Sequence, residues 1–345
     1  MNKAISENCF AGLDIGSHTT RLLIAEKSGQ SLVALRSERR VTRLAEGFNH
    51  AGAISEKAQR RNIEALKEYA SILGEFEVVG VSCGATGVVR RAQNFPEVLG
   101  RIAAETGLDC KILSEDSEAR LSAKGILSAI DPGAKAPLFF DVGGGSTEFI
   151  LPGSPDWVAS ASRPIGAATL TEAYLAADPP GAGAVNLATL EARRQIEAAK
   201  EMLYENLHKN GKILPSKELM LAGTAGTLTT LAAIKLRMNR YEPHRVNGAE
   251  LFLDWILRTI EEISLLPRSE RRKIAGLEPG REEIILAGAV IVSQILFCFG
   301  AKSCTVSDAG LLEGLVIEIA EREDRNPGEV APGLRTDLTW RRPKR

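Results

Sequence analysis

The sequence predicts an α/β protein of two domains built on the same plan, and three observations support this. A short motif occurs twice, as Gly-Leu-Asp-Ile-Gly-Ser at residues 12–17 and as Phe-Asp-Val-Gly-Gly-Gly-Ser-Thr-Glu at residues 140–148. Apolar runs flank each copy, as expected of two strands joined by a tight turn. Strand and helix patterns alternate after each copy. A chain of 345 residues is long enough for two domains.

The repeated motif sets the expected domain boundaries. We place the first domain at residues 1–130 and the second at residues 131–322, with the last helix free to pack back on the first domain. Residues 323–345 are rich in Pro, Gly and Arg, which predicts a loosely attached basic tail. Because a cleft between two similar domains is a natural ligand site, we expect the substrate there.

The elements of the first half follow from apolar spacing and capping residues. In order, we expect a hairpin over 9–26, a third strand over 31–35, a helix over 55–73 capped by Ser55, a strand over 78–82, a helix over 96–106, a strand over 111–113, and a helix from Ser114 to about residue 130.

The second half restarts with the second motif. We expect a hairpin around it, a loop over 177–183, a helix over 187–207, a strand over 218–221, a helix over 251–264, a buried helix within 284–299, a strand over 304–306 and a helix over 311–320.

The glycine-rich turn of the second motif predicts a phosphate site. Gly143, Gly144 and Gly145 let the backbone approach a ligand and turn its N–H groups outward, and Ser146 adds a hydroxyl. In an ordinary hairpin, three consecutive glycines would lower stability and serve no structural purpose. A carboxylate beside a phosphate makes sense when a divalent cation lies between them. We therefore expect a metal near Asp141.

The first loop repeats this chemistry in a shorter form. It offers Asp14, Gly16 and Ser17, while His18 is equally a substrate contact or a solvent-facing turn residue. Arg90 follows the strand at 78–82, and its planar guanidinium suits phosphate oxygens, although a solvated helix face explains it as well. The glycines and threonines of 222–227 fit either an anion site at a helix start or a tight strand-to-helix connection.

Composition excludes several classes of function. The net charge of −1 implies no general attraction to nucleic acid, and the hydrophobic content of 44% is ordinary for a soluble protein. The N-terminus lacks the pattern of a secretory signal, and the apolar run at 284–299 is too short to span a bilayer. We expect a cytoplasmic protein without membrane or nucleic-acid partners. The five cysteines contain no CxxC pair, so we expect buried, reduced thiols.

Several motifs in a fixed order resemble the exopolyphosphatase and guanosine pentaphosphate phosphatase (Ppx/GppA) family. The resemblance covers nearly the whole chain, from residue 11 to about residue 318. It includes both glycine loops, Thr42-Arg-Leu44, Arg90-x-Ala-x-Asn94, Ile112-Leu-Ser-Glu-Asp-Ser-Glu-Ala-Arg-Leu121, Pro164-Ile-Gly166, Gly223-Thr-Ala-Gly-Thr227 and Ser307-Asp-Ala-Gly-Leu311. It implies two duplicated actin-like domains of the sugar kinase and actin superfamily (ribonuclease H-like) with an interdomain cleft.

The resemblance also implies the roles of individual residues. Glu118 would be the general base, although the residues alone fit acids that complement a helix dipole. Mg²⁺ or another divalent cation would be held near Asp141, and our own mechanistic hypothesis adds Asp14 or Glu148 as further ligands through water. Both glycine loops and Arg90 would contact phosphate. Two positions depart from the family pattern, since Ser117 replaces an acidic neighbour of the base and Leu312 replaces an arginine.

The expected activity is hydrolysis of the terminal phosphoanhydride bond of inorganic polyphosphate, guanosine pentaphosphate or both. The sequence does not choose between these substrates, and the resemblance implies a homodimer of the short, two-domain form. Two alternatives stay open: an ATP-dependent small-molecule kinase of the same superfamily, and a non-enzymatic nucleotide-binding sensor or scaffold.

Overall fold

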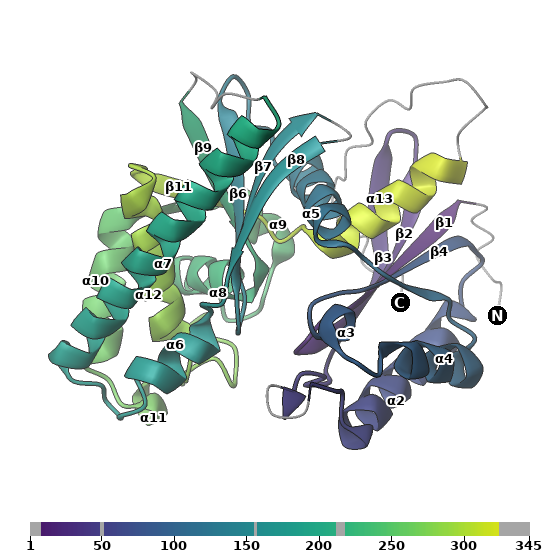
Figure 1. The fold of residues 1–345 in the computed structure, drawn as a ribbon, viewed down its shortest axis with the longest axis horizontal. Coiled ribbons are helices and arrows are strands. Elements are labelled where there is room, and N and C mark those ends of the chain that lie inside the picture. The colour runs from purple at the N-terminus through teal and green to yellow at the C-terminus, as the bar shows by residue number, and fades with distance from the viewer. Residues whose placement is uncertain (1–7, 49–51, 155–156, 212–217, 324–345) are drawn as a thin grey trace. The chain divides into compact units, whose positions relative to one another are not determined.

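The computed structural model describes residues 8–48, 52–154, 157–211 and 218–323 (Figure 1). The predicted basic tail beyond residue 323 lies outside the described residues. The chain divides into two compact units. The first contains the described residues up to Ser128 and from Ala309 onward, and the second contains Ala129–Asp308.

The first unit is built on a five-stranded mixed sheet with the order β3-β2-β1-β4-β5. Its strands are β1 (Cys9–Ile15), β2 (Thr19–Ser28), β3 (Ser31–Val41), β4 (Val78–Ala85) and β5 (Cys110–Ile112). Strands β1, β2 and β3 are antiparallel neighbours, whereas β1, β4 and β5 run parallel. The first glycine loop therefore lies between β1 and β2, at the same sheet end as the exit of β4.

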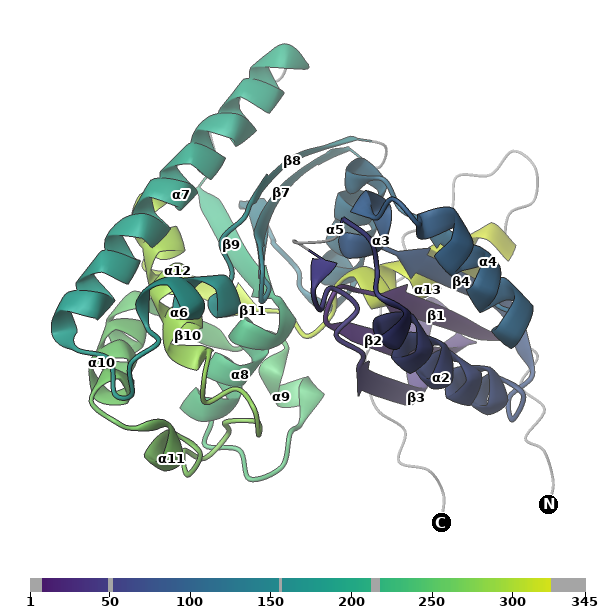
Figure 2. The same cartoon turned by 60° about the horizontal axis from the view of Figure 1, so that its bottom comes forward.

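Helices cover both faces of this sheet, as Figures 1 and 2 show. They are α2 (Glu56–Leu73), α3 (Val88–Arg91), α4 (Phe95–Thr106), α5 (Glu115–Ala129) and α13 (Leu311–Glu323). Helix α13 packs on β1, β2 and β4, while α2 and α4 close a second core on the opposite face. Helix α5 closely approaches the start of α13. A Cβ at Gly125 would lie 1.9 Å from the carbonyl oxygen of Gly310, the residue before α13. Only glycine fits that crossing.

The second unit repeats the plan around a six-stranded sheet with the order β10-β11-β9-β6-β7-β8. Its strands are β6 (Ala136–Val142), β7 (Thr147–Ser154), β8 (Trp157–Arg163), β9 (Leu219–Thr224), β10 (Glu250–Phe252) and β11 (Ser303–Val306). Strands β6, β7 and β8 are antiparallel, and β6, β9 and β11 are parallel. The second glycine loop joins β6 to β7, which is the equivalent position.

The helices of the second unit enclose its main hydrophobic core. They are α6 (Ala167–Tyr174), α7 (Ala182–Lys209), α8 (Ala225–Lys235), α9 (Pro243–Val246), α10 (Leu253–Ser264), α11 (Arg268–Arg271) and α12 (Ile285–Cys298). Helix α12 is buried almost throughout and packs on α6, α7, α8 and α10. This confirms the expected buried helix, whose apolar residues face neighbours on every side.

Most predicted elements are present, and the differences include strand pairings and short helices that the sequence pattern did not predict, such as α3, α6, α9 and α11. Residues 251–252, expected as helix, form part of the short strand β10, which pairs with β11. Residues 182–183, expected as loop, begin α7. Strand β4 continues to Ala85 because β1 and β5 pair with its last residues. Strand β8 was not predicted, and it depends on pairing with β7.

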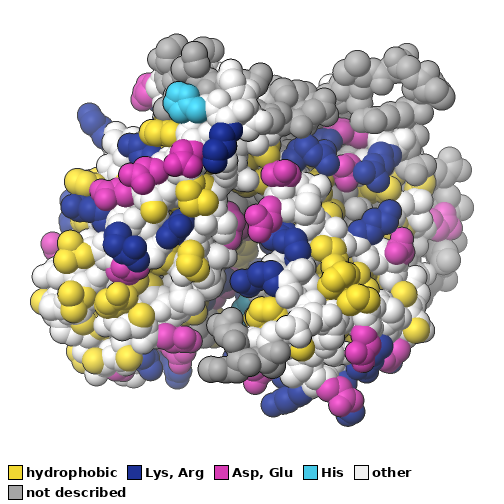
Figure 3. Space-filling model, in the orientation of Figure 1, with side chains coloured by type: hydrophobic (Ala, Val, Ile, Leu, Met, Phe, Trp, Pro, Cys, Tyr) yellow, Lys and Arg dark blue, Asp and Glu magenta, His cyan; other side chains and the backbone are white. Residues whose placement is uncertain are grey.

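The surface mixes charges of both signs. Figure 3 shows basic and acidic side chains intermingled on the face in view, in keeping with the net charge of −1. Among the described helices, none combines the length and apolar character needed to cross a bilayer.

Candidate active site

The first glycine loop is a tight turn between β1 and β2 that neighbouring segments hold in place. The Gly16 N–H donates to the Thr19 carbonyl oxygen at 3.0 Å and closes the turn. The Thr86 N–H donates to the Ile15 carbonyl oxygen at 3.1 Å, which ties the exit of β4 to the loop. A Cβ at Gly87 would lie 2.6 Å from the Ser17 Oγ, so the two turns are in close contact. Gly87 has a φ of +54°, which glycine adopts without strain.

Arg90 and Glu118 form an ion pair beside this loop. Arg90 lies on α3, which begins directly after Gly87, and Glu118 lies in the first turn of α5. The Arg90 Nη1 donates to Glu118 Oε2 at 2.8 Å and to the Leu113 carbonyl oxygen at 2.8 Å. Its Nη2 reaches Glu115 at 3.5 Å. The predicted phosphate ligand and the predicted base therefore contact each other.

The environment of Glu118 suits a general base. Burial raises the pKa of the Glu118 carboxyl above its usual range, and the negative charges of Asp14 and Glu115 raise this pKa further. The hydrogen bond and positive charge of Arg90 oppose the rise. A carboxylate with a raised pKa accepts a proton more readily than an exposed one, so this side chain can activate a water molecule.

Asp14 presents one paired and one unpaired oxygen. Its Oδ2 accepts from Nε and Nη2 of Arg21, at 3.1 and 2.7 Å. Asp14 is 5% exposed, and its buried Oδ1 has no hydrogen-bond partner within the described part of the chain. A buried carboxylate oxygen left without a donor is a ligand suited to a divalent cation or a water bound to one.

The second glycine loop lies at the equivalent turn of the second unit. The Gly143 N–H donates to the Ser146 carbonyl oxygen at 3.0 Å, matching the bond that closes the first loop. Gly144 and Gly145 are exposed, and among the described residues their N–H groups have no hydrogen-bond acceptor. These two amides, rather than that of Gly143, are available to an anion.

Contacts with α6, Thr227 and Gly166 hold the second loop in place. The Gly143 and Gly144 carbonyl oxygens accept from the first N–H groups of α6 at 2.8–3.1 Å. The Thr227 Oγ1 donates to the Val142 carbonyl oxygen at 2.9 Å. A Cβ at Gly166 would lie 2.4 Å from the Gly144 carbonyl carbon, so only glycine fits there. The Gly143 and Gly144 carbonyl oxygens are thus occupied, whereas the Gly144 and Gly145 amides are available to a ligand.

Asp141 and Glu148 are direct cross-strand partners on β6 and β7, so their side chains share a face of the sheet. Glu148 Oε1 accepts from the Ser162 Oγ at 3.1 Å. Both lie in the second unit, whereas Asp14 lies in the first. Within the described residues, no group of three or more His, Cys, Asp or Glu side chains is arranged to hold a metal.

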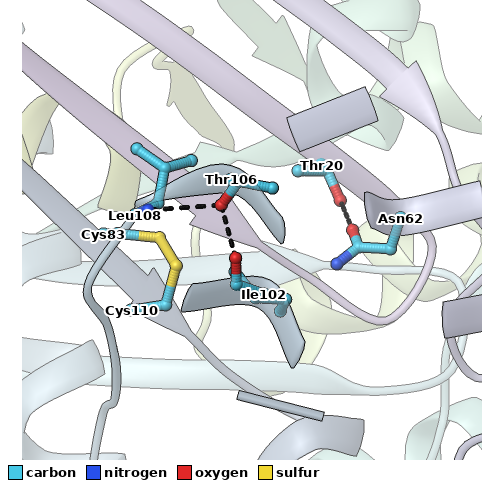
Figure 4. The surroundings of a disulfide bond; sticks show 7 residues. All are labelled: Thr20, Asn62, Cys83, Ile102, Thr106, Leu108 and Cys110. Atoms are coloured by element: carbon cyan, nitrogen blue, oxygen red, sulfur yellow. Dashed lines mark hydrogen bonds between the residues drawn. A yellow bond between two sulfur atoms is a disulfide. The ribbon is translucent and has the colours of Figure 1, made fainter. Parts of the chain in front are cut away.

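The prediction that all five cysteines are reduced was wrong for two of them. Cys83 and Cys110 form a disulfide between β4 and β5, shown in Figure 4. The two residues are register partners in the sheet, and their Cα atoms are 4.6 Å apart. Sequence spacing does not reveal this pairing, because it depends on the alignment of two strands. Within the described part of the chain, Cys9, Cys298 and Cys304 form no disulfide.

Comparison with known proteins identifies the family. The sequence model of the Ppx/GppA phosphatase family matches residues 23–323.

The chain belongs to the Ppx/GppA phosphatase family.

Two curated relatives and one crystal structure agree with this assignment. Exopolyphosphatase 2 of Mycobacterium tuberculosis is 30% identical over 334 residues, which cover 90% of this chain and 98% of that protein. A bifunctional 3-dehydroquinate synthase/phosphatase of Fusobacterium nucleatum is 29% identical over 322 residues, and the match spans 91% of this chain but 47% of that longer protein. The crystal structure of the Aquifex aeolicus Ppx/GppA family member has a TM-score of 0.78 at 30% identity, covering 92% of this chain and 99% of that one.

The structural match settles the fold of this Ppx/GppA family member. It is the predicted α/β fold with two duplicated actin-like domains. Sequence reasoning missed two features of the site. One is the Arg90–Glu118 ion pair, and the other is the packing of Gly166 against the second loop. The Pro164-Ile-Gly166 motif was the available signal for the second feature.

Proposed function

We propose that this protein hydrolyses the terminal phosphoanhydride bond of inorganic polyphosphate, guanosine pentaphosphate or both. The observation that carries the proposal is Glu118, a partly buried carboxylate with a raised pKa, held by Arg90 beside a glycine loop. The names of the curated relatives, which include exopolyphosphatases, support the same reaction class.

In this mechanism the chain supplies positioning and a base. Within the second unit, the exposed amides of Gly144 and Gly145 hold phosphate oxygens together with the Ser146 hydroxyl, and within the first unit the Ser17 hydroxyl is a phosphate contact. Glu118 orients a water molecule and accepts its proton as the water attacks the terminal phosphorus in line. Arg90 keeps the Glu118 carboxylate in one orientation. Phosphoryl transfer depends mainly on such positioning and on charge stabilisation.

We propose Mg²⁺ as the cofactor, because each unit by itself offers carboxylate oxygens of the kind that this ion binds. In the first unit, the buried Oδ1 of Asp14 has no hydrogen-bond partner among the described residues, and in the second unit Asp141 and Glu148 present two carboxylates on one face of β6 and β7. Hard oxygen ligands of this kind suit Mg²⁺. When bound, the ion would neutralise the charge that phosphate oxygens carry in the transition state.

The proposal is tested by phosphate release from tripolyphosphate, long-chain polyphosphate and guanosine pentaphosphate, with Mg²⁺ and with EDTA. Release without an acceptor, abolished by EDTA, is the expected result. ATP consumption only in the presence of a small-molecule acceptor would favour the kinase alternative. Tight binding of all three substrates without turnover would favour a sensor or scaffold. We also propose a homodimer, which sedimentation of the purified protein would test.

A further inference from the structure

Arg43 has a strained backbone directly beside the first glycine loop. Its φ is +46°, in the left-handed region that long side chains rarely adopt. Two other described non-glycine residues, Ala225 and Arg237, also have positive φ. A strained backbone conformation persists only where neighbouring contacts hold the residue in it, and such residues concentrate at ligand-binding positions.

The surroundings of Arg43 tie its backbone to the loop. The Thr42 and Arg43 N–H groups both donate to the His18 carbonyl oxygen, at 3.0 and 2.9 Å. The Ala45 N–H donates to the Ser17 carbonyl oxygen at 2.9 Å. On either side of Arg43, Thr42 and Leu44 are 1% and 0% exposed, so the segment is anchored at both ends. The Arg43 side chain therefore starts next to the phosphate-binding turn and cannot be moved away by a small backbone shift.

The charge of Arg43 is also uncompensated. Neighbouring arginines in this unit form ion pairs, for example Arg40 with Glu68 and Arg61 with Glu46. Arg43 is exposed, and within the described part of the chain its guanidinium has neither a hydrogen bond nor an ion pair. A glycine or asparagine at this position would carry less strain. A cation here is therefore best explained by a ligand rather than by stability.

Arg237 is an arginine with positive φ whose conformation has a purely structural explanation. It has a φ of +48° and is exposed, but it follows the C-cap Leu236 of α8. A left-handed residue is ordinary at that position, and a cation there complements the helix dipole. Arg43 lies between a strand and a turn and has no such explanation.

We propose that Arg43 binds the phosphates that follow the terminal phosphoryl group of the substrate. This inference rests on the proposed function, because it assigns a second contact to the same substrate. A planar guanidinium suits two oxygens of an internal phosphate. The residue would favour chains of three or more phosphates over pyrophosphate.

The test compares ligand affinity and stability in the full chain. On a Glu118→Gln background, which limits turnover, calorimetric titration with tripolyphosphate and pyrophosphate is performed for the parent, Arg43→Gly, Arg43→Asn and Arg43→Lys. We expect Arg43→Gly and Arg43→Asn to weaken tripolyphosphate binding about tenfold or more, and pyrophosphate binding less. Lysine should restore part of the loss. The melting temperature of Arg43→Gly should be unchanged or raised by about 2–4 °C.

Arg237→Gly is the matched control, because it relieves the same backbone conformation without touching the loop. It should leave both affinities unchanged. If Arg43→Gly and Arg43→Asn bind tripolyphosphate as tightly as the parent, or Arg237→Gly weakens binding equally, the assignment is overturned. A parent that binds tripolyphosphate while the wild-type chain releases no phosphate refutes the proposed function alone. A parent that binds no tripolyphosphate refutes the assignment of Arg43 and the hydrolysis of polyphosphate.

Discussion

The replacement Glu118→Gln tests the centre of the proposed mechanism. Glutamine keeps an oxygen that can accept the 2.8 Å hydrogen bond from Arg90, but it cannot accept a proton from water. Removing a positioned general base typically lowers kcat by ~10²–10⁴. That loss corresponds to about 3–5 kcal/mol of transition-state stabilisation.

The same change should affect stability only slightly. The side chains of Arg90 and Glu118 are 24% and 30% exposed, so the ion pair is partly shielded from water. Glutamine loses the charge-assisted part of the bond, about 1 kcal/mol. It also removes a carboxylate whose burial was unfavourable, as the raised pKa of Glu118 shows. Since these effects oppose each other, the net change should stay within about 1 kcal/mol.

The assay is phosphate release at saturating tripolyphosphate with Mg²⁺, together with KM and the melting temperature. Glu115→Gln is the matched control, because Glu115 lies in the same helical turn and approaches Arg90 at 3.5 Å, but its side chain is 76% exposed. This control should keep kcat within about twofold, since exposed pairs contribute little. A folded Glu118→Gln protein within about threefold of wild-type kcat would refute the assignment, as would an equal loss in Glu115→Gln.

Three further predictions follow from the same geometry. Burial raises the pKa of Glu118 and Arg90 lowers it, so kcat/KM should rise with pH through a midpoint above the pKa of ordinary glutamates. Arg90→Gln should move this midpoint to higher pH. A midpoint that stays in place or moves to lower pH contradicts the pairing of Arg90 with Glu118. Gly166→Ala places a Cβ 2.4 Å from the Gly144 carbonyl carbon, so it should lower the free energy of unfolding by about 1–3 kcal/mol and raise KM. Denaturant unfolding and steady-state kinetics measure the two effects. Wild-type values in both measurements would refute the role of Gly166 in supporting the second loop. Cys83→Ser removes a disulfide between residues that are 27 positions apart, so it should lower the free energy of unfolding by about 3 kcal/mol in non-reducing buffer. An unfolding free energy equal to that of the wild type would mean that the disulfide does not form in solution.

Local sequence was enough to predict the two loops and the helix that carries Glu118. Glycine runs between apolar strands mark turns, and Ser114 marks the start of α5, where its Oγ accepts from the Ser117 N–H at 3.1 Å. These signals act over three or four residues, so they do not depend on the rest of the fold.

Features that depend on pairing between strands were missed or misread. Strands β8 and β10 exist because β7 and β11 supply their partners. The Cys83–Cys110 disulfide depends on the register of β4 with β5. Short strands carry a weak sequence signal, because most of their stability comes from neighbours that the linear pattern does not identify.

The sequence by itself determined the fold class, the duplicated plan and the residue types available for chemistry, because turn and capping preferences and apolar periodicity are properties of neighbouring residues. Only the tertiary structure decided how those residues are used. It joined Arg90 to Glu118 and held Arg43 in a strained conformation beside the first loop, and among the described residues it gave Asp14 Oδ1 and the Gly144 and Gly145 amides no hydrogen-bond partner. Burial, pairing and strain are set by groups that meet only when the chain folds, and so they cannot be read from local pattern.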